Sequence, residues 1–430
     1  MRVALVNPPW RYDHSIYFGC HEPHLPLELA YAKALLERHG HEALMLDGHL
    51  WERTAASLAE EVAAFAPDAT VVATAPSYLF WRCAPPELRI PREFLAALGE
   101  RGGTTIAVGP HGSATPGATL RKLGVDAVVR GECEEVILAI AVAGTTDRIA
   151  GTALIEDGIL HLNGTVQAAR FVDLPALVWP ADWIARHTHH HHRFGTPAEG
   201  LGAEVEASRG CPYSCSFCAK IDFRDRYRRR DLASLMSEID GLRAQGVRYL
   251  YFIDEIFLPN RPLLQALVGS GMAFGIQTRL DLWKPDLLDL LGEAGCVSIE
   301  AGVESLTEEG RAALAKDCRL TTGELTERLI RARQRVPFVQ ANLIASGTDD
   351  PATVIAWRDE LQRHGVWAND PVPLYPYPSS PDYRRLWGEP DDYAWERAHE
   401  HYLGQFTRLS EIQAQRPLPL RELERSCLTD

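Results

Sequence analysis

Three cysteines on one short segment are the residues of this chain best suited to chemistry. Cys211, Cys215 and Cys218 are separated by four and then three positions within residues 209–218, RGCPYSCSFC. This spacing brings three thiolates together on one tight loop and leaves the fourth position of a tetrahedral centre to a ligand that is not protein. A metal site with an open position is typical of a catalytic centre.

Two other uses of these cysteines are less consistent with the sequence. A structural zinc site needs four closed ligands, usually two pairs, and no second pair lies near residues 211–218. A disulfide framework is not indicated. Nine cysteines in 430 residues is an ordinary content, and an uneven number cannot all be paired. The first residues also resemble a strand more than a secretory signal. The residues therefore favour an iron–sulfur cluster.

The segment resembles the C-x-x-x-C-x-x-C signature of the radical S-adenosylmethionine (radical SAM) enzymes, including the aromatic Phe217 before the last cysteine. The resemblance implies a 4Fe–4S cluster in which each cysteine holds one iron, while the methionyl amino and carboxylate groups of S-adenosylmethionine bind the fourth. Reductive cleavage would then yield a 5'-deoxyadenosyl radical. The resemblance also implies an external electron donor such as a flavodoxin or ferredoxin.

The residues after the cysteines alternate between strand and helix patterns, as a partial (β/α) barrel requires. Apolar runs suited to buried parallel strands alternate six times with stretches of helical period. The expected strands cover residues 204–208, 249–253, 274–278, 297–301, 339–344 and 366–368. Six units predict an open, TIM-like (β/α)6 barrel over residues 203–366.

Polar residues stand where these strands end, the edge at which such barrels place their chemistry. Asp254 and Glu255 occupy the place of a Gly-Gly-Glu contact to the methionyl amine in many radical SAM enzymes, although the glycines are absent. Glu304, in a segment resembling the ribose-binding strand end of the family, could accept hydrogen bonds from ribose hydroxyls. Arg279 could pair with a carboxylate, and Gly347 would let the backbone approach an adenine ring.

The predicted S-adenosylmethionine site consists of Phe217, Asp254, Glu255, Gln277, Arg279, Glu304, Ser305, Asn342 and Gly347. For each charged residue the alternative is a solvated loop position or a salt bridge at the rim of the barrel. Four polar positions at successive strand ends favour the binding site for the group as a whole.

Residues 1–140 have a separate α/β pattern. Five short apolar runs alternate with helical stretches, which predicts an open, doubly wound, Rossmann-like sheet with its ligand site beyond the carboxyl edge. No G-x-G-x-x-G follows the first run, where Asn7, Pro8, Pro9 and Trp10 stand instead. A nicotinamide cofactor is therefore not expected.

The loops of this unit resemble those of the cobalamin-binding domain fused to many radical SAM enzymes. In that family the loops after the first, third, fourth and fifth strands hold the corrin and its tail. The resemblance implies a cobalamin site formed by Pro8, Pro9, Trp10, Ser77, Tyr78, Gly109, His111, Gly131 and Glu132.

Asp47 and His49 resemble part of the D-x-H-x-x-G motif that supplies a histidine to cobalt in some cobalamin proteins. Position 52 is glutamate, however, and the pair follows the second strand instead of the first. We interpret both as loop residues and expect the lower face of the cobalt to lack a histidine ligand. Cys20, Cys83 and Cys133 lie too far apart to indicate the second cluster of transfer RNA methylthiotransferases, and are interpreted as small apolar residues.

Two segments complete the chain. Residues 141–202 are expected to form a linker, in which His189 to His192 could bind a metal but are interpreted as solvated. Residues 367–430 are rich in proline and aromatic residues, which excludes a long helix. We expect this extension to wrap the open side of the barrel and line the substrate pocket, with plain packing as the alternative.

Charge and hydropathy restrict the partners. The formal net charge of −14 offers a phosphate-rich RNA little electrostatic attraction, so no nucleic-acid partner is expected. The arginines between 224 and 230 are an exception that could contact an anionic group or form salt bridges with Asp225 and Asp231. No apolar run reaches the ~20 residues that span a bilayer. An oxygen-sensitive cluster predicts a reducing cytoplasm.

Together these patterns predict a cobalamin-dependent radical SAM enzyme that methylates an unactivated carbon of a small molecule. An anionic or saccharide-like substrate is suggested only by the arginine run and the aromatic extension. The alternatives are radical rearrangement, cyclisation or ring contraction without methyl transfer, a methylthiotransferase-like enzyme acting on transfer RNA, and a non-catalytic iron–sulfur protein. An electron carrier would have little use for the second domain.

Overall fold

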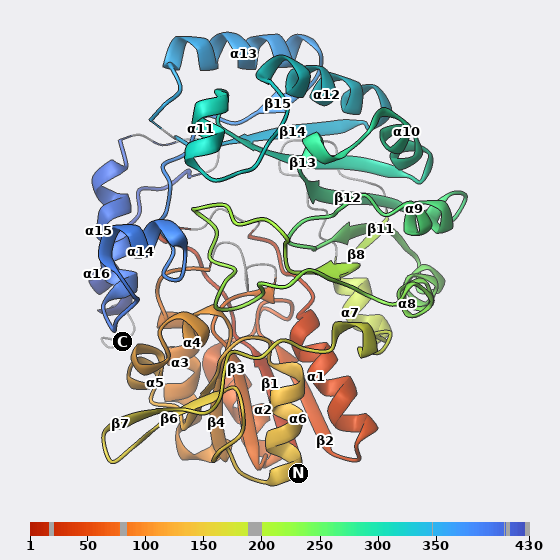
Figure 1. The fold of residues 1–430 in the computed structure, drawn as a ribbon. Coiled ribbons are helices and arrows are strands. Elements are labelled where there is room, and N and C mark those ends of the chain that lie inside the picture. Colours follow the sequence, from red (N-terminus) through yellow and green to blue (C-terminus); the bar gives the residue numbers. More distant parts are fainter. Residues whose placement is uncertain are drawn as a thin grey trace.

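The computed structural model describes residues 1–16, 21–77, 84–187, 200–345, 347–407, 409 and 413–425. Two α/β units lie one against the other, and three C-terminal helices run along one side of their boundary (Figure 1). The fold class predicted from the sequence, a doubly wound sheet followed by a partial barrel, is confirmed.

The first unit is a seven-stranded sheet with the order β2-β1-β3-β4-β5-β6-β7. Its first five strands are parallel: β1 (Arg2–Asn7), β2 (Glu42–Asp47), β3 (Ala69–Ala73), β4 (Thr104–Val108) and β5 (Ala127–Val129). The helices are α1 (Leu27–Arg38), α2 (Ala55–Phe65), α3 (Arg89–Leu98), α4 (Pro110–Ala114), α5 (Pro116–Leu123) and α6 (Glu134–Ala143). Alternate residues of β1 belong to different cores, Val3 and Leu5 to one and Ala4 and Val6 to the other. Apolar cores on both faces explain why these strands are continuous apolar runs.

This sheet continues beyond residue 140, where the sequence predicted the end of the unit. Strands β6 (Thr152–Glu156) and β7 (Ile159–Leu162) form a hairpin that pairs antiparallel with β5. Part of the expected linker therefore belongs to the first sheet, because β6 satisfies the backbone groups that β5 would expose at an edge. The short helix α7 (Ala181–Arg186) follows. His189 to His192 lie outside the described residues.

The second unit is a parallel six-stranded sheet with the order β15-β14-β13-β12-β11-β8, so each strand lies beside the previous one. The strands are β8 (Leu201–Val205), β11 (Val247–Phe252), β12 (Ala273–Thr278), β13 (Cys296–Glu304), β14 (Phe338–Leu343) and β15 (Trp367–Ala368). The connecting helices are α8 (Leu232–Ala244), α9 (Arg261–Leu267), α10 (Pro285–Glu293), α11 (Glu308–Ala313), α12 (Thr322–Arg335) and α13 (Pro351–Arg363). The six predicted strands are all present, and the end strands β8 and β15 leave the barrel open.

The C-terminal extension is made of three short helices, α14 (Pro381–Trp387), α15 (Ala394–Gln405) and α16 (Leu420–Arg425). It contacts the first unit, where Trp395 Nε1 donates to Thr115 Oγ1 over 3.0 Å and Lys122 Nζ lies 3.2 Å from Glu424 Oε2. It also reaches the loop that carries the cysteines. In the described ranges no helix combines the length and apolar character needed to cross a membrane.

Candidate functional site

The three cysteines lie on a loop that a two-stranded ribbon ties at its base. Strands β9 (Ser208–Arg209) and β10 (Arg228–Arg229) pair antiparallel on either side of it. Gly210 has φ +80°, and a Cβ there would overlap the carbonyl oxygen of Arg226, so the turn into the loop requires glycine. The N–H of Cys218 donates to the carbonyl of Cys215 over 3.2 Å, which folds the last two cysteines into one turn.

The three thiols are half-buried and influence one another. Burial raises the pKa of Cys218 to about 12, and the charges of Cys211 and Cys215 act in the same direction. Burial also raises the pKa of Cys211 and of Cys215. Three thiolates this close repel one another unless a cationic centre lies among them, which is the donor chemistry of an iron site. Within the described residues no three potential ligands already stand in the arrangement of a bound metal ion.

The loop is held from two sides at Ser216, between the second and third cysteines. Its N–H donates to Leu314 O over 2.9 Å, from the segment after α11. Its hydroxyl donates to Asp382 Oδ2 over 3.0 Å, and its carbonyl accepts from the N–H of Asp382 over 2.8 Å. The C-terminal helix α14 therefore positions the cysteine loop directly.

Asp254 and Glu255 lie at the base of the cysteine loop and hold it. Asp254 accepts from the N–H of Ala207 over 2.8 Å and from the Ser208 hydroxyl, and burial raises its pKa well above the usual range. Glu255 accepts from the N–H of Gly210 over 2.7 Å. Both carboxyl groups thus support the cysteine loop, and their contact with the methionyl amine stays a prediction.

Arg279 and Glu304 come from neighbouring strand ends and face the cysteine loop. The Arg279 guanidinium lies 4.2 Å from the ring centroid of Tyr213 and forms an ion pair with Asp281 at 2.8 Å. Glu304 ends β13 with φ +65° and lies 2.8 Å from Lys316 Nζ. The sequence did not point to Tyr213 or Lys316. A tyrosine or a single lysine carries no local signal of function, and the contacts with Arg279 and Glu304 become visible only in the fold.

The other predicted members of this set contact the protein itself or lie half-buried, and their role in binding stays a prediction. Ser305 is buried and donates to Asp349 Oδ1 over 2.8 Å, whereas Asn342 accepts from Gln340 Nε2 over 2.6 Å. A Cβ on Gly347 would meet nothing within 4 Å, so its φ of +74° explains the glycine without a close ligand. Gln277 is half-buried on β12, and Phe217 is half-buried on the cysteine loop.

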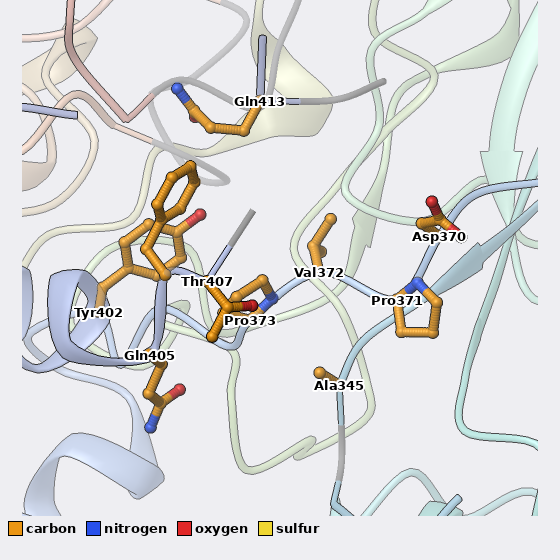
Figure 2. A pocket seen from close by; sticks show the side chains of 10 residues that line it. Ala345, Asp370, Pro371, Val372, Pro373, Tyr402, Gln405, Thr407 and Gln413 are labelled. Carbon is orange, nitrogen blue, oxygen red and sulfur yellow. The ribbon is translucent and has the colours of Figure 1, made fainter. Parts of the chain in front are cut away.

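A pocket of about 250 Å³ lies where β14 and β15 end, between the barrel and the C-terminal extension (Figure 2). Ala345 and Asp370 line it from the strand ends. Tyr402 and Phe406 line it from α15 and the residues after it, with ring centroids 6.2 Å apart. The pocket therefore opens at the edge of the barrel where polar strand ends and the cysteine loop also lie.

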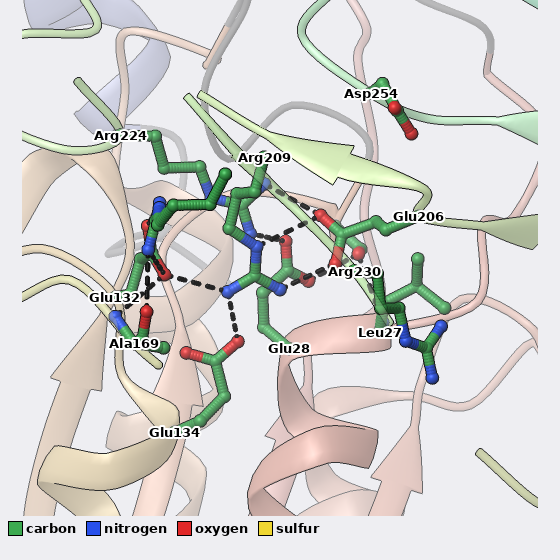
Figure 3. A network of polar contacts seen from close by, with 12 residues as sticks. Leu27, Glu28, Glu132, Glu134, Ala169, Glu206, Arg209, Arg224, Arg230 and Asp254 are labelled. Carbon is green, nitrogen blue, oxygen red and sulfur yellow. Dashed lines mark hydrogen bonds and ion pairs between the residues drawn. The ribbon is translucent and has the colours of Figure 1, made fainter. Parts of the chain in front are cut away.

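The arginines around the cysteine loop belong to a buried charge network that spans both units (Figure 3). Arg209 is fully buried and lies 3.0 Å from Glu132, 2.7 Å from Glu134 and 2.6 Å from Glu206. Arg224 lies 3.1 Å from Glu28 and 3.3 Å from Glu255. Two carboxylates on Arg209 and one on Arg224 come from the first unit.

The buried ion pairs of this network show what the arginines between 224 and 230 contact. Arg224 and Arg230 are buried in ion pairs with glutamates, and the Arg230 guanidinium lies 2.7 Å from Glu238. Asp231 instead caps α8 by accepting from the N–H of Ser234 over 2.8 Å. The interpretation of these arginines as members of salt bridges is thus supported, but their partners are glutamates instead of Asp225 and Asp231.

The described candidate residues of the first unit lie just beyond the carboxyl ends of β1, β3, β4 and β5, at the edge of the sheet that faces the barrel (Figure 1), with His111 in α4. Tyr78 lies outside the described residues. His111 is fully buried, its Nε2 lies 2.9 Å from Pro85 O, and its ring stacks on Trp395 with centroids 4.4 Å apart. Burial lowers the pKa of His111 to about 3, so it is neutral at physiological pH.

Two polar members of that set are used by the protein itself. Ser77 is buried, donates to Glu28 and accepts from the N–H of Leu27 over 3.2 Å. Glu132 is committed to Arg209 and Arg228. Neither presents a free polar group at the sheet edge.

The backbone at this edge is shaped by prolines and glycines. Trp10 donates from Nε1 to Asn7 Oδ1 over 2.7 Å, and Pro8 and Pro9 have no N–H. An apolar surface could lie on this turn without burying an unpaired donor. Gly109 (φ +128°) and Gly131 (φ +90°) are required by the chain's own contacts with Thr74 and Gln167.

Asp47 and His49 serve the loop after β2, as interpreted from the sequence. Asp47 is buried and accepts from Asn7 Nδ2 and from the N–H groups of His49 and Leu50, at 2.8–2.9 Å. Burial lowers the pKa of His49 to about 4. Of the N-terminal cysteines, Cys133 is buried, and Cys20 and Cys83 lie outside the described residues.

Residues 205–348 match the family model of the radical SAM superfamily. The chain is 25% identical over 329 residues to an uncharacterized methyltransferase of Pyrococcus horikoshii, covering 71% of this chain and 66% of the relative. It is 26% identical over 290 residues to the anaerobic magnesium-protoporphyrin IX monomethyl ester cyclase of Cereibacter sphaeroides, covering 61% and 45%. The hopanoid C-3 methylase of Methylococcus capsulatus is 26% identical, with 74% and 61% covered. The chain thus spans about half to two thirds of the length of these curated relatives.

Two solved structures share the fold of nearly the whole chain. The radical S-adenosylmethionine methyltransferase TsrM of Kitasatospora setae, with cobalamin and a 4Fe–4S cluster bound, superposes with a TM-score of 0.68 at 21% identity. That match covers 88% of this chain and 76% of TsrM. The cobalamin-dependent radical enzyme OxsB superposes with a TM-score of 0.65 at 14% identity, covering 98% of this chain and 57% of OxsB.

Proposed function

We propose that this chain, of which residues 205–348 match the family model of the radical SAM superfamily, is a cobalamin-dependent radical SAM enzyme that methylates an unactivated carbon of a small molecule. The observation that carries the proposal is the loop of Cys211, Cys215 and Cys218, three half-buried thiols held against the carboxyl edge of an open barrel. The first unit brings a second candidate cofactor site to the same boundary.

The cysteine loop fits an iron–sulfur cluster, because its three thiols oppose one another's ionisation unless a positive centre joins them. When bound, the cluster supplies the electron for reductive cleavage of S-adenosylmethionine. Ser216 fixes the loop through Leu314 and Asp382, and Glu255 holds Gly210, so the chain supplies the positions of the three ligands in advance.

Arg279 and Glu304 are the strand-end residues best placed for S-adenosylmethionine. The Arg279 guanidinium, stacked on Tyr213, would attract the methionyl carboxylate. Glu304 would accept hydrogen bonds from the ribose hydroxyls. Asp254 and Glu255 would act indirectly, by supporting the cysteine loop.

The edge of the first unit fits cobalamin through its backbone more than through its polar side chains. Pro8 and Pro9 offer surface without donors, and His111 is neutral and covered by Trp395. When bound, cobalamin supplies the methyl carrier. Asp47 holds the loop after β2 through the N–H groups of His49 and Leu50, and we expect no residue of that loop to ligate the cobalt.

The pocket beside Tyr402 and Phe406 would receive the substrate. At about 250 Å³ it exceeds the ~150 Å³ of a cavity that holds benzene, so it suits a molecule of about two fused rings. A TsrM structure with tryptophan as substrate shares this fold. We place the reaction in the cytoplasm, with a flavodoxin or ferredoxin as the electron donor.

A second candidate function is radical cyclisation or rearrangement without methyl transfer. The similarity to three anaerobic magnesium-protoporphyrin IX monomethyl ester cyclases, each 26% identical, favours it. The two functions differ in products: both release 5'-deoxyadenosine and methionine when the radical forms, whereas only methyl transfer consumes a second S-adenosylmethionine and leaves S-adenosylhomocysteine.

One experiment tests the proposal. The chain is reconstituted anaerobically with iron, sulfide and hydroxocobalamin, then given reductant and S-adenosylmethionine, and bound cobalt, 5'-deoxyadenosine and S-adenosylhomocysteine are measured. We expect bound cobalt, and deoxyadenosine that disappears in Cys215→Ala. A chain that binds no cobalamin would overturn the cobalamin assignment, and deoxyadenosine formed equally by Cys215→Ala would overturn the cluster assignment. S-Adenosylhomocysteine formed only with substrate would favour methylation over cyclisation.

A further inference from the structure

Lys316 is a buried lysine beside the cysteine loop. Its side chain is 2% exposed, and its Nζ lies 2.8 Å from Glu304 Oε2. Removing an ammonium group from water is costly, and an ion pair offsets the lost hydration only in part. A lysine in this position therefore has to be explained by the charge that it brings there.

The backbone that presents Lys316 is strained on both sides. Ala315 has φ +49° and Asp317 has φ +50°, and Glu304, the partner of Lys316, has φ +65°. Non-glycine residues in this left-handed region carry backbone strain, and such residues cluster at functional sites. Three such residues are thus part of, or adjacent to, the ion pair of Lys316 and Glu304.

The segment of Lys316 is tied to the cysteine loop before and after the lysine. Leu314 O accepts from the N–H of Ser216 over 2.9 Å. Asp317 O accepts from Arg279 Nη2 over 2.9 Å, and that guanidinium lies over the ring of Tyr213. The ammonium is therefore held at a set place relative to the three thiols. Lys316 and Glu304 bring opposite charges to this place beside the cysteine loop.

We propose that Lys316 is a positioning and charge-balancing residue of the cluster site, whose ammonium stabilises the reduced cluster and orients Glu304. This inference rests on the proposed function. A cluster held by three thiolates gains one negative charge when it accepts one electron from a flavodoxin- or ferredoxin-type donor, and no bond forms or breaks in that step. A fixed positive charge nearby favours the more negative state and so makes the cluster easier to reduce.

The test is the midpoint potential of the cluster in the full chain, reconstituted anaerobically and titrated with dithionite while the reduced form is followed by electron paramagnetic resonance. At the wild-type midpoint we expect the ratio of reduced to oxidised cluster to fall roughly tenfold in Lys316→Met, equivalent to about 59 mV for one electron. Lys316→Arg keeps the charge and should stay near wild type. Lys33→Met removes a lysine from an exposed pair with Glu37 on α1 and is the matched control.

A second variant separates electrostatics from structural damage. Glu304→Gln removes the opposing charge and should shift the ratio toward the reduced cluster, opposite to Lys316→Met. If Lys316→Met does not fold, Glu304→Gln is sufficient as a test. An unchanged or lowered ratio of reduced to oxidised cluster in Glu304→Gln then overturns the inference. Unchanged potentials in both variants would also overturn it, with the proposed function intact, whereas a wild-type chain without a 4Fe–4S signal would remove both.

Discussion

Arg209 Nη1 lies 2.7 Å from Glu134 Oε1, and this contact joins the base of the cysteine loop to the first turn of α6 in the other unit. Both side chains are fully buried. Arg209 stands two positions before Cys211, so the first ligand of the proposed cluster is placed by an ion pair to helix α6 of the first unit. The ion pair thereby fixes the cysteine loop relative to the first unit, which carries the candidate cobalamin site.

Arg209→Met should destabilise the chain by about 3–5 kcal/mol, the usual cost of leaving a buried charge without its partner. Glu134 would lose the ion-pair partner that the structure records for it. Thermal unfolding of the apoprotein measures the loss. Adding Glu134→Leu should recover part of it, because the unpaired carboxylate is then gone.

Arg101→Met is the control for that prediction. Arg101 forms an ion pair with Glu60 at 2.7 Å, but the two side chains are 45% and 73% exposed. Its loss should cost less than about 1 kcal/mol. Equal losses for Arg101→Met and Arg209→Met would show that the buried network contributes no more than a surface pair.

The fold was largely predictable because its signals are local. Strand β11 is an apolar run buried on both faces over residues 249–252, and this pattern can be recognised without knowledge of its neighbours. The hairpin of β6 and β7 was missed because β7 is exposed throughout and lacks such a run in the core. Its place depends on an available edge of β5, which no local pattern reveals.

The site was predictable only where one segment carries all the chemistry, as the cysteine loop does. Arg224 was interpreted from its basic neighbours, yet its partner Glu28 is 196 positions away. Asp254 and Ser305 were correctly placed at strand ends but are engaged by Ser208 and Asp349. Whether a polar group faces a ligand or the protein depends on long-range packing that spacing does not encode.

Cys218→Ser should reduce the iron bound after reconstitution, because serine replaces one of three thiolates with a hydroxyl that is far harder to ionise. Iron and sulfide assays with the visible spectrum of the cluster measure the effect. Cys296→Ser is the matched control, since Cys296 is buried in β13 and contacts Ser298 O. Full iron in Cys218→Ser, or equal loss in both variants, would contradict the ligand assignment.

Glu204 should make stability depend on pH through its two histidines. Its oxygens lie 2.9 Å from His24 Nδ1 and 3.0 Å from His187 Nε2. Burial alone would raise the pKa of Glu204, but His187 and His24 bring it well below the usual range. Burial would lower the pKa of His187, but Glu204 outweighs that effect and raises it above 6.5.

The directions of these two pKa shifts define the pH range in which the Glu204–His187 pair stabilises the fold. Glu204 contributes stability above its unfolded pKa of 4.5 and loses it as the pH falls through the lower folded value. His187 contributes fully below 6.5 and loses its contribution as the pH rises through its raised folded value. The difference in melting temperature between wild type and Glu204→Gln should therefore be larger near pH 6 than at pH 9. Glu42→Gln, in an exposed pair with Arg2, should show little difference at either pH, and a Glu204→Gln difference that grows with pH would contradict the assignment.

Asp382→Ala should loosen the cysteine loop without removing a ligand. The substitution deletes the carboxylate that accepts from the Ser216 hydroxyl and leaves the backbone bond to Ser216 O in place. A hydrogen bond to a charged group contributes about 1.5–3 kcal/mol, so the reconstituted cluster should lose iron to a chelator at least several-fold faster than in wild type. Asp240→Ala, which breaks an exposed pair with Arg243 on α8, should leave that rate unchanged. If Asp382→Ala released iron no faster than Asp240→Ala, the C-terminal extension would hold the loop through its backbone alone.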